Sequence, residues 1–197
     1  MCGRYEFSLE QPTLREIWQQ VQARFPHVNM EAGEIFPTSL VPVLLDAGGT
    51  LDPQPARWGF PGRDGKGTVI NARAETAASK PMFRSSLLHR RCAVPTSGFF
   101  EWSHDRANNK YRFRQTGSGA LYLAGLWRDC SGERRFVILT RPANASIADL
   151  HDRMPVILRE DQLDAWVHDD RRTAYLLTQE APQLTRKSED YEQQSLF

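Results

Sequence analysis

The start of the sequence carries its most reactive arrangement, because Met1 is followed by Cys2. Small second residues such as cysteine generally permit removal of the initiator methionine, and we expect that removal here. It would leave an α-amine and a thiol on adjacent carbons. Such a 1,2-aminothiol condenses with an aldehyde to a thiazolidine ring and needs no cofactor. An α-amine titrates near pH ~7.7–8.0 and a lysine near ~10.4, so the α-amine is the better nucleophile at neutral pH.

Three further residues are candidates for proton transfer or positioning. Glu101 lies in the aromatic run SGFFEW, where strand alternation would place it opposite Phe100 and Trp102. Burial there would raise its pKa and make it a general acid and base near neutrality, whereas the alternative is an exposed strand carboxylate. His151 precedes a strand start at an X-Pro pair and is either functional or structural. Asn71 suits a cap, or the orientation of an amine or an ester oxygen.

Three arginines accompany these groups, and each lies within two residues of one of them: Arg4 of Cys2, Arg73 of Asn71 and Arg153 of His151. Singly, each arginine would be an ordinary solvated charge. If the candidate groups converge in the fold, the guanidiniums converge as well and form a phosphate-binding patch. The five histidines show no H-x-x-x-H or H-E-x-x-H spacing, so no metal site is predicted.

Composition limits the class of protein. The 197 residues fit one domain, and 40% hydrophobic with 25% charged residues is ordinary globular material. A net charge of +1 means that any polyanion site must be a local patch. Three cysteines without a C-x-x-C pair favour a reducing compartment over disulfides or a zinc site. No apolar run suggests a signal peptide or a membrane span, so we expect a cytoplasmic monomer without membrane contact.

Periodicity predicts the elements that position these groups. Residues 3–7 alternate like a strand, and Leu14, Ile17, Trp18 and Val21 recur at helical spacing. Pro42 suggests that the strand over residues 37–45 lies at a sheet edge. The second half reads as antiparallel hairpins. We therefore predict an α+β fold, a single compact domain with a mostly antiparallel, barrel-like β core and flanking helices. This domain would cover residues 1–184, and residues 185–197 would form a flexible C-terminal tail.

Five sequence blocks, taken together, resemble the SOS response-associated peptidase (SRAP) family, whose members sense abasic sites in single-stranded DNA. They are MCGRY, WGF, INARAET, SGFFEW and LHDRMPVIL, and they run in order from residue 1 to about residue 158. The resemblance implies the family's α+β fold with a basic DNA groove. It also implies that the N-terminal cysteine forms a stable thiazolidine with the ring-opened aldehyde of an abasic deoxyribose.

The resemblance also assigns roles to individual residues. It makes Cys2 the nucleophile, and it gives Asn71 the task of positioning the amine and contacting the opened sugar. Glu101 would shuttle protons during ring opening and imine formation, and His151 would assist proton transfer and reversal of the linkage. The family's phosphate-contacting arginines fall on Arg4, Arg73 and Arg153, and a polar residue near the site falls on Thr140.

Two departures from the family pattern concern DNA contacts. Many relatives carry base-stacking tryptophans after the W-G pair, whereas residues 61–67 here contain no aromatic residue. Base stacking would then have to come from Trp58, Phe36 or Phe60, or be weaker than in those relatives. The family's Asn-x-Ala-Pro-Thr block is also changed and reads EIFPT here, at residues 34–38.

Three functions remain open at this stage. The first is covalent capture of abasic sites in single-stranded DNA by an enzyme of the DNA damage response, with or without abasic-site lyase activity. The second is an N-terminal thiol peptidase that acts through Cys2 and removes its own propeptide. The third is a non-catalytic single-stranded DNA-binding module.

Overall fold

Five strands close into a barrel at the centre of the computed structural model, which describes residues 2–103, 106, 108–117 and 119–189. Each barrel strand is paired with two others, in the order β12, β4, β3, β8, β11 and back to β12. Only the β12–β4 pair is parallel. The strands are β3 (Leu40–Asp46), β4 (Leu51–Trp58), β8 (Arg91–Thr96), β11 (Leu121–Cys130) and β12 (Glu133–Pro142).

Three short strands extend the barrel at its rim. β7 pairs with β12 in parallel, β13 pairs with β12 in antiparallel fashion, and β14 pairs with β11. Their bounds are β7 (Asn71–Arg73), β13 (Arg153–Pro155) and β14 (Ile157–Leu158). Two of these three strands carry predicted site residues, because Asn71 opens β7 and Arg153 opens β13.

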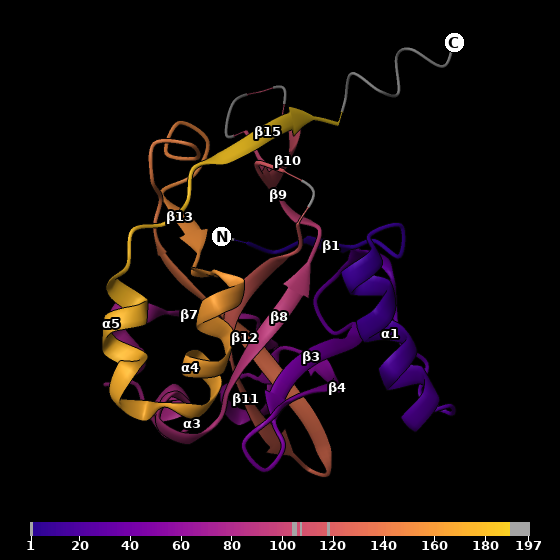
Figure 1. Cartoon of the computed structure of the whole chain (residues 1–197). Helices are drawn as coiled ribbons and strands as arrows, with labels where there is room; N and C mark the ends of the chain where they lie inside the picture. Colours follow the sequence, from indigo (N-terminus) through magenta and orange to yellow (C-terminus); the bar gives the residue numbers. More distant parts are fainter. Residues whose placement is uncertain (1, 104–105, 107, 118, 190–197) are drawn as a thin grey trace.

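A second, antiparallel sheet of five strands lies across one end of the barrel, at the top of Figure 1. Its order is β15-β10-β9-β1-β2, and the N-terminal segment enters the fold through β1. The strands are β1 (Tyr5–Phe7), β2 (Gly33–Ile35), β9 (Gly98–Trp102), β10 (Lys110–Gln115) and β15 (Leu184–Ser188). The predicted strand near the N-terminus and the hairpins of the second half are confirmed.

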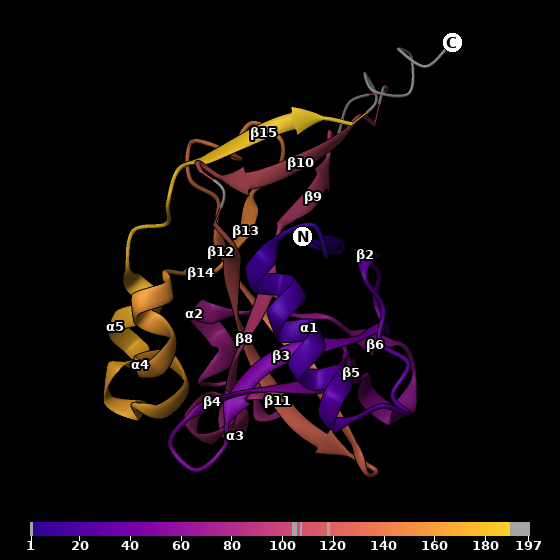
Figure 2. The ribbon, with the colours of Figure 1, turned by 45° about the vertical axis from the view of Figure 1, so that its right-hand side comes forward.

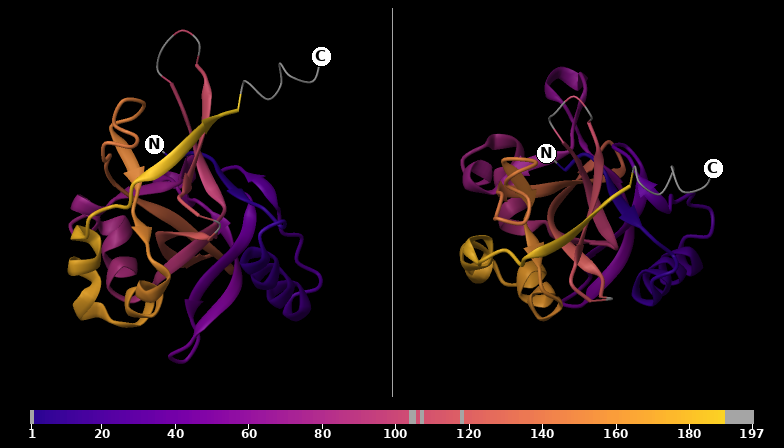
Figure 3. Two further views of the ribbon diagram at one scale, coloured as in Figure 1. Left: turned by 45° about the horizontal axis from the view of Figure 1, so that its top comes forward. Right: turned by 90° about the horizontal axis from the view of Figure 1, so that it is seen from above.

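Helices cover the sides of the barrel (Figures 1 and 2). The first helix buries Leu14, Ile17 and Val21, as their spacing predicts, begins with Pro12 and ends shortly before Pro26. The last two helices pack on the opposite side, as Figure 3 also shows. The helices are α1 (Pro12–Arg24), α2 (Ala74–Ala77), α3 (Pro81–His89), α4 (Leu163–His168) and α5 (Thr173–Thr178). In the described ranges, no helix is long and apolar enough to span a membrane.

The glycine-rich segment after Trp58 is an exposed hairpin. Two short strands, β5 (Phe60–Pro61) and β6 (Thr68–Val69), pair with each other, and the 3-10 turn η1 (Arg63–Gly65) joins them. Two further 3-10 turns flank α4, namely η2 (Glu160–Gln162) and η3 (Asp170–Arg172).

Two predictions are wrong, one about a sheet edge and one about where the C-terminal tail begins. β3 is not an edge strand, because it pairs with both β4 and β8. Pro42 is tolerated there since it lies opposite Pro55, so two residues without an amide proton face each other, and Leu44 makes the pairing with β8. The flexible tail does not begin at residue 185, because Leu184–Ser188 pairs with β10 over five residues. Residues 190–197 of that predicted tail lie outside the described residues.

Candidate active site

Cys2 lies in the interior of the protein, where β1 enters between the five-stranded sheet and the barrel. Its side chain is fully buried, and its Sγ lies 3.8 Å from the carbonyl oxygen of Arg4. The Nδ2 atom of Asn71 donates a hydrogen bond of 2.9 Å to the carbonyl oxygen of Cys2. Residues that are 69 positions apart in the sequence therefore meet because β7 pairs with β12 at the barrel rim. The pairing of β7 fixes the backbone from which the Asn71 amide reaches Cys2.

Burial keeps the Cys2 thiol protonated at neutral pH. Loss of solvent raises the pKa of the thiol well above its usual range, and the charge of Glu101 raises it further. A thiol nucleophile of the protease type needs the opposite, a pKa lowered by a cation or a base.

Glu101 is a buried carboxyl group on β9. Its side chain is 4% exposed, and its neighbour across the ladder in β10 is Tyr111. Desolvation raises the pKa of Glu101 to about 7, and the negative charge of Asp152 adds to the effect. A carboxyl group that titrates near neutrality can both donate and accept a proton, as the sequence predicted for this position.

His151 precedes β13, in the loop that joins β12 to it. Its Nδ1 accepts a hydrogen bond of 2.9 Å from the backbone N–H of Arg153 and lies 2.8 Å from Oδ1 of Asp152. Asp152 in this loop carries the negative charge that further raises the pKa of Glu101. Cys2, Asn71 and Glu101 therefore come from three separate segments and lie near one another, whereas His151 is linked to them only through its neighbour Asp152.

The three predicted arginines differ in how exposed and how neutralised they are. Arg73 is exposed and makes no side-chain hydrogen bond or ion pair within the described part of the chain. Arg4 pairs with Glu34 at 2.7 Å, and Glu34 also binds Lys110 at 2.7 Å. Arg153 is nearly buried and pairs with Glu75. Carboxylates thus neutralise two of the three guanidiniums of the predicted phosphate-binding patch.

Thr140 and Trp58, the predicted DNA-contacting residues of the barrel, are both buried. Thr140 is 0% exposed, and its backbone oxygen accepts a hydrogen bond of 2.7 Å from Nη2 of Arg153. Trp58 is also 0% exposed, and its indole N–H donates to the carbonyl oxygen of Ile70 at 3.0 Å. Phe60 is likewise fully buried. In this structure, Trp58 and Phe60 fill the core instead of stacking on bases.

Sequence reasoning missed the two carboxylates that hold the arginines. Glu75 stands only two residues after Arg73, inside the same INARAET block, so proximity to the predicted site was a usable signal. Glu34 occupies the position of the family's asparagine in the altered EIFPT block. That change was visible in the sequence, but its pairing with Arg4 depends on the β1–β2 ladder.

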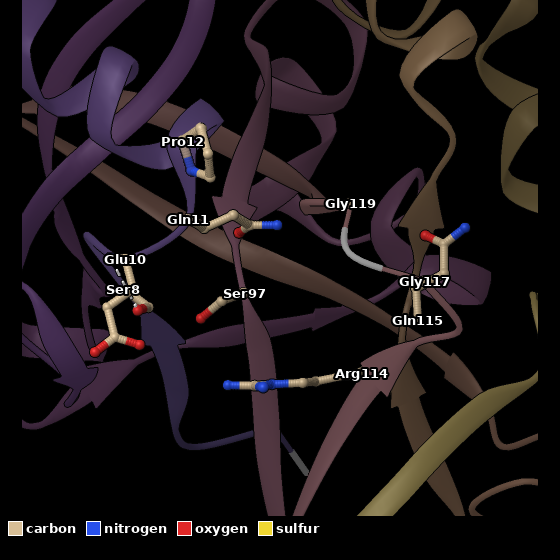
Figure 4. Close-up of a pocket in the computed structure, with 9 residues that line it drawn as sticks. All are labelled: Ser8, Glu10, Gln11, Pro12, Ser97, Arg114, Gln115, Gly117 and Gly119. Atoms are coloured by element: carbon tan, nitrogen blue, oxygen red, sulfur yellow. Dashed lines mark hydrogen bonds between the residues drawn. The ribbon is translucent and has the colours of Figure 1, made fainter.

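A separate cavity of about 300 Å³ opens beside the N-terminus of α1 (Figure 4). Its arginine, Arg114, binds Glu6 at 2.7 Å, and Glu6 also accepts a hydrogen bond from Ser97 at 2.8 Å. The lining consists of Ser8, Glu10, Gln11, Pro12, Ser97, Arg114, Gln115, Gly117 and Gly119. None of the predicted site residues takes part in it.

Known structures share this fold. A crystal structure of a protein from Bacteroides thetaiotaomicron superposes with a TM-score of 0.78 at 22% identity, covering 98% of this chain and 94% of that one. A protein from Bordetella bronchiseptica gives a TM-score of 0.76 at 22% identity, with coverages of 95% and 99%. The predicted α+β class with a barrel-like core is therefore confirmed.

Sequence comparison identifies the relatives. The abasic site processing protein YedK of Escherichia coli (strain K12) is 28% identical over 177 residues, or 85% of this chain and 79% of YedK. YoaM of Bacillus subtilis (strain 168), also an abasic site processing protein, is 38% identical over 107 residues. That match covers 51% of this chain, which spans about half (47%) of the length of YoaM. The family model described as SOS response associated peptidase (SRAP) matches residues 1–193, so the chain belongs to the SRAP family.

Proposed function

We propose that this protein processes abasic sites by covalent capture of the ring-opened aldehyde in single-stranded DNA, after Met1 has been removed. The observation that carries the proposal is the contact between Asn71 and the carbonyl oxygen of Cys2, in a buried site beside Glu101. The names of YedK and YoaM, both abasic site processing proteins, support the same substrate class.

The reaction balances without a cofactor. Glu101 in its protonated form donates to the ring oxygen of the abasic sugar, the bond between C1′ and the ring oxygen breaks, and the anomeric hydroxyl passes its proton back to the Glu101 carboxylate, which gives the aldehyde. The free amine of Cys2 attacks the aldehyde carbon, and loss of water leaves an imine. The Cys2 sulfur then adds to the imine carbon, and the thiol proton passes to the nitrogen. The product is a thiazolidine, and one water molecule is released.

The residues around Cys2 suit this order of events. The α-amine is the nucleophile that is available near neutral pH, whereas the buried thiol stays protonated until the imine has formed. Asn71 holds the Cys2 backbone, and Glu101 moves protons with its pKa near 7. Exposed Arg73 supplies a cation for the strand's phosphates. Capture would shield the lesion during the DNA damage response.

A denaturing gel tests the proposal directly. Purified protein whose intact mass confirms the loss of Met1 is incubated with an oligonucleotide that contains one abasic site. The expected result is a heat-stable shifted band for the abasic single strand and none for the intact strand. Cys2→Ser keeps the amine and should give a band only after borohydride reduction of the imine. A full, heat-stable band with Cys2→Ala would overturn the proposal.

The word peptidase in the family description supports a second candidate, hydrolysis of peptides by Cys2. The raised pKa of the thiol argues against it, because a thiol hydrolase needs a reactive thiolate. Turnover of a peptide library that is lost in Cys2→Ala would favour this function. Binding of the strand without any bond that survives denaturation would favour a non-catalytic binding module.

A further inference from the structure

One exposed aromatic residue lies close to Cys2. Among the described residues, three large hydrophobic side chains are exposed, namely Phe36 (45%), Leu88 (47%) and Tyr175 (54%). Phe36 directly follows β2, whose last residue, Ile35, is paired with Tyr5 in β1. It is therefore the exposed aromatic residue that the sheet places beside the N-terminal segment.

A cation covers one face of the Phe36 ring. The Cζ atom of Arg4 lies 3.6 Å from the ring centroid of Phe36 and 5.5 Å from that of Trp102. Glu34 fixes the same guanidinium through an ion pair of 2.7 Å. The stack of Trp102, Arg4 and Phe36 is thus assembled before any ligand arrives, and the remaining exposure of Phe36 is available for contact with a ligand.

The backbone of Phe36 is also fixed. Its carbonyl oxygen accepts a hydrogen bond of 3.1 Å from the N–H of Ser39, and its own N–H donates to Oγ of Ser39 at 3.4 Å. Ser39 is 3% exposed and donates to Glu31 at 2.6 Å. A ring held in this way loses little conformational entropy on binding, which favours its use as a rigid contact.

The stack connects directly to the reactive residue. The carbonyl oxygen of Arg4 lies 3.8 Å from Sγ of Cys2, so the residue that supports Phe36 also contacts the thiol. The other two aromatic side chains that the sequence offered for stacking, Trp58 and Phe60, are both fully buried. Phe36 alone among these three is accessible.

We propose that Phe36 is a stacking platform for the nucleobase next to the abasic residue captured at Cys2. This inference rests on the proposed function. An abasic residue leaves its neighbouring base without a stacking partner on one side, and a rigid aromatic ring near the captured sugar can replace that partner. Base stacking on aromatic side chains tolerates any base, because every base has a π-face. The platform therefore recognises the flank of the lesion without reading its sequence.

A cycle of protein and DNA changes tests the platform. The Cys2→Ala background removes the cross-link, and the probe is a fluorescent single strand with a tetrahydrofuran residue as a stable abasic analogue. Phe36→Ala should weaken its binding by about 5- to 150-fold, the equivalent of ~1–3 kcal/mol per stacked base. The test is repeated with strands in which a second tetrahydrofuran replaces the nucleotide on either the 5′ or the 3′ side of the first. On the side whose base stacks on Phe36, Phe36→Ala should then change the affinity by less than about two-fold.

Two further variants make the result specific. Phe36→Leu keeps an apolar side chain but lacks the ring. Its affinity should lose the dependence on the neighbouring base in the same way, which separates the loss of stacking from any disturbance of β2. Tyr175→Ala removes another exposed aromatic ring, one that also has an arginine near it, with Arg172 at 5.7 Å. This control should bind the strand with one tetrahydrofuran and the strand with two as tightly as the Cys2→Ala protein does.

The outcomes separate the two proposals. Cross-linking by the protein with native Cys2 tests capture independently of Phe36. The platform is overturned, and capture stands, if that protein cross-links but Phe36→Ala has no effect on binding. The same holds if Phe36→Ala weakens binding equally whether or not a base is present next to the abasic residue, on both sides. If no cross-link forms, the proposed function fails, whatever the cycle shows.

Discussion

Both terminal nitrogens of Arg153 are bound to the carboxylate of Glu75, with Nη1 at 2.5 Å from Oε1 and Nη2 at 2.9 Å from Oε2. Nη2 also donates to the carbonyl oxygen of Thr140. The Arg153 guanidinium lowers the pKa of Glu75 to about 2, so the pair is ionised throughout the neutral range. A guanidinium held in this way is oriented for binding but carries little net charge toward a DNA phosphate.

We expect Glu75→Gln to increase the salt dependence of single-strand binding. Gln keeps an acceptor for Arg153 but removes the negative charge, so Arg153 would displace an additional counterion from the strand. The log–log salt slope should become steeper by up to ~0.7. Affinity is measured by fluorescence anisotropy between low and moderate salt in the Cys2→Ala background.

Glu133→Gln is the matched control, because Glu133 is also an arginine-bound glutamate, paired with Arg57 and Arg135 at the opposite end of β12. Its slope should not change. Arg73→Ala, which removes an exposed cation, should make the slope shallower by about 0.7. An unchanged slope in Glu75→Gln would mean that Arg153 does not meet the strand.

Glu101 makes stability depend on pH. Its folded pKa of about 7 lies above the usual ~4.3, so the folded state retains a proton that the unfolded state releases. The stabilising effect is fully present below about pH 4.3 and is lost as pH rises to about 7. Glu101→Gln lacks this titration, and it should therefore stabilise the protein more at pH 8 than at pH 4.5. Urea unfolding at both pH values measures the difference.

The stability change caused by Glu133→Gln is expected to depend on pH in the opposite direction. Arg57 and Arg135 lower the pKa of Glu133, so its contribution is present above the usual pKa and is lost in acid. This variant should lose more stability at pH 8 than at low pH. If Glu101→Gln behaves in the same way, the Glu101 carboxyl group is not held in its protonated form.

Asn71→Ala should slow cross-linking more than it weakens binding. The substitution removes the 2.9 Å donor to the carbonyl oxygen of Cys2, and a lost hydrogen bond to a buried acceptor costs ~1–3 kcal/mol. If this loss appears in the transition state, the single-turnover rate falls by roughly 5- to 150-fold. The affinity for an uncleavable abasic analogue should stay within about two-fold. An unchanged rate would show that the contact does not position the reactive amine.

Truncation tests the correction made to the C-terminal boundary. A chain that ends at residue 183 lacks β15, which pairs with β10 over five residues and contains nearly buried Leu184. Loss of that burial and of the ladder should lower the free energy of unfolding by about 2 kcal/mol. A chain that ends at Glu189 keeps the strand and is the control. Equal stability of the two chains would mean that β15 contributes nothing to the fold.

The local sequence was sufficient for much of the fold, and it pointed to candidate groups for the chemistry of the site. Helical spacing of Leu14, Ile17 and Val21 predicted α1, and alternation with turn residues predicted the hairpins, because these patterns reflect which face of an element is buried. The aromatic neighbours of Glu101 offered burial with a raised pKa as one of two alternatives, and the structure has the carboxyl group buried. Cysteine at position 2 indicated aminothiol chemistry, since that depends on covalent neighbours alone.

Only the tertiary structure decided how these groups are partnered. The contact of Asn71 with Cys2 and the pairs Arg153–Glu75 and Arg4–Glu34 join residues that are 30 to 78 positions apart. Such contacts depend on which strands become neighbours, and no local pattern specifies them. The same limit explains why Trp58 was predicted at the surface and lies in the core, and why Phe36 is the accessible ring. Exposure, and the pKa shifts that follow from it, are properties of the assembled sheets, whereas the chemical type of each side chain was already present in the sequence.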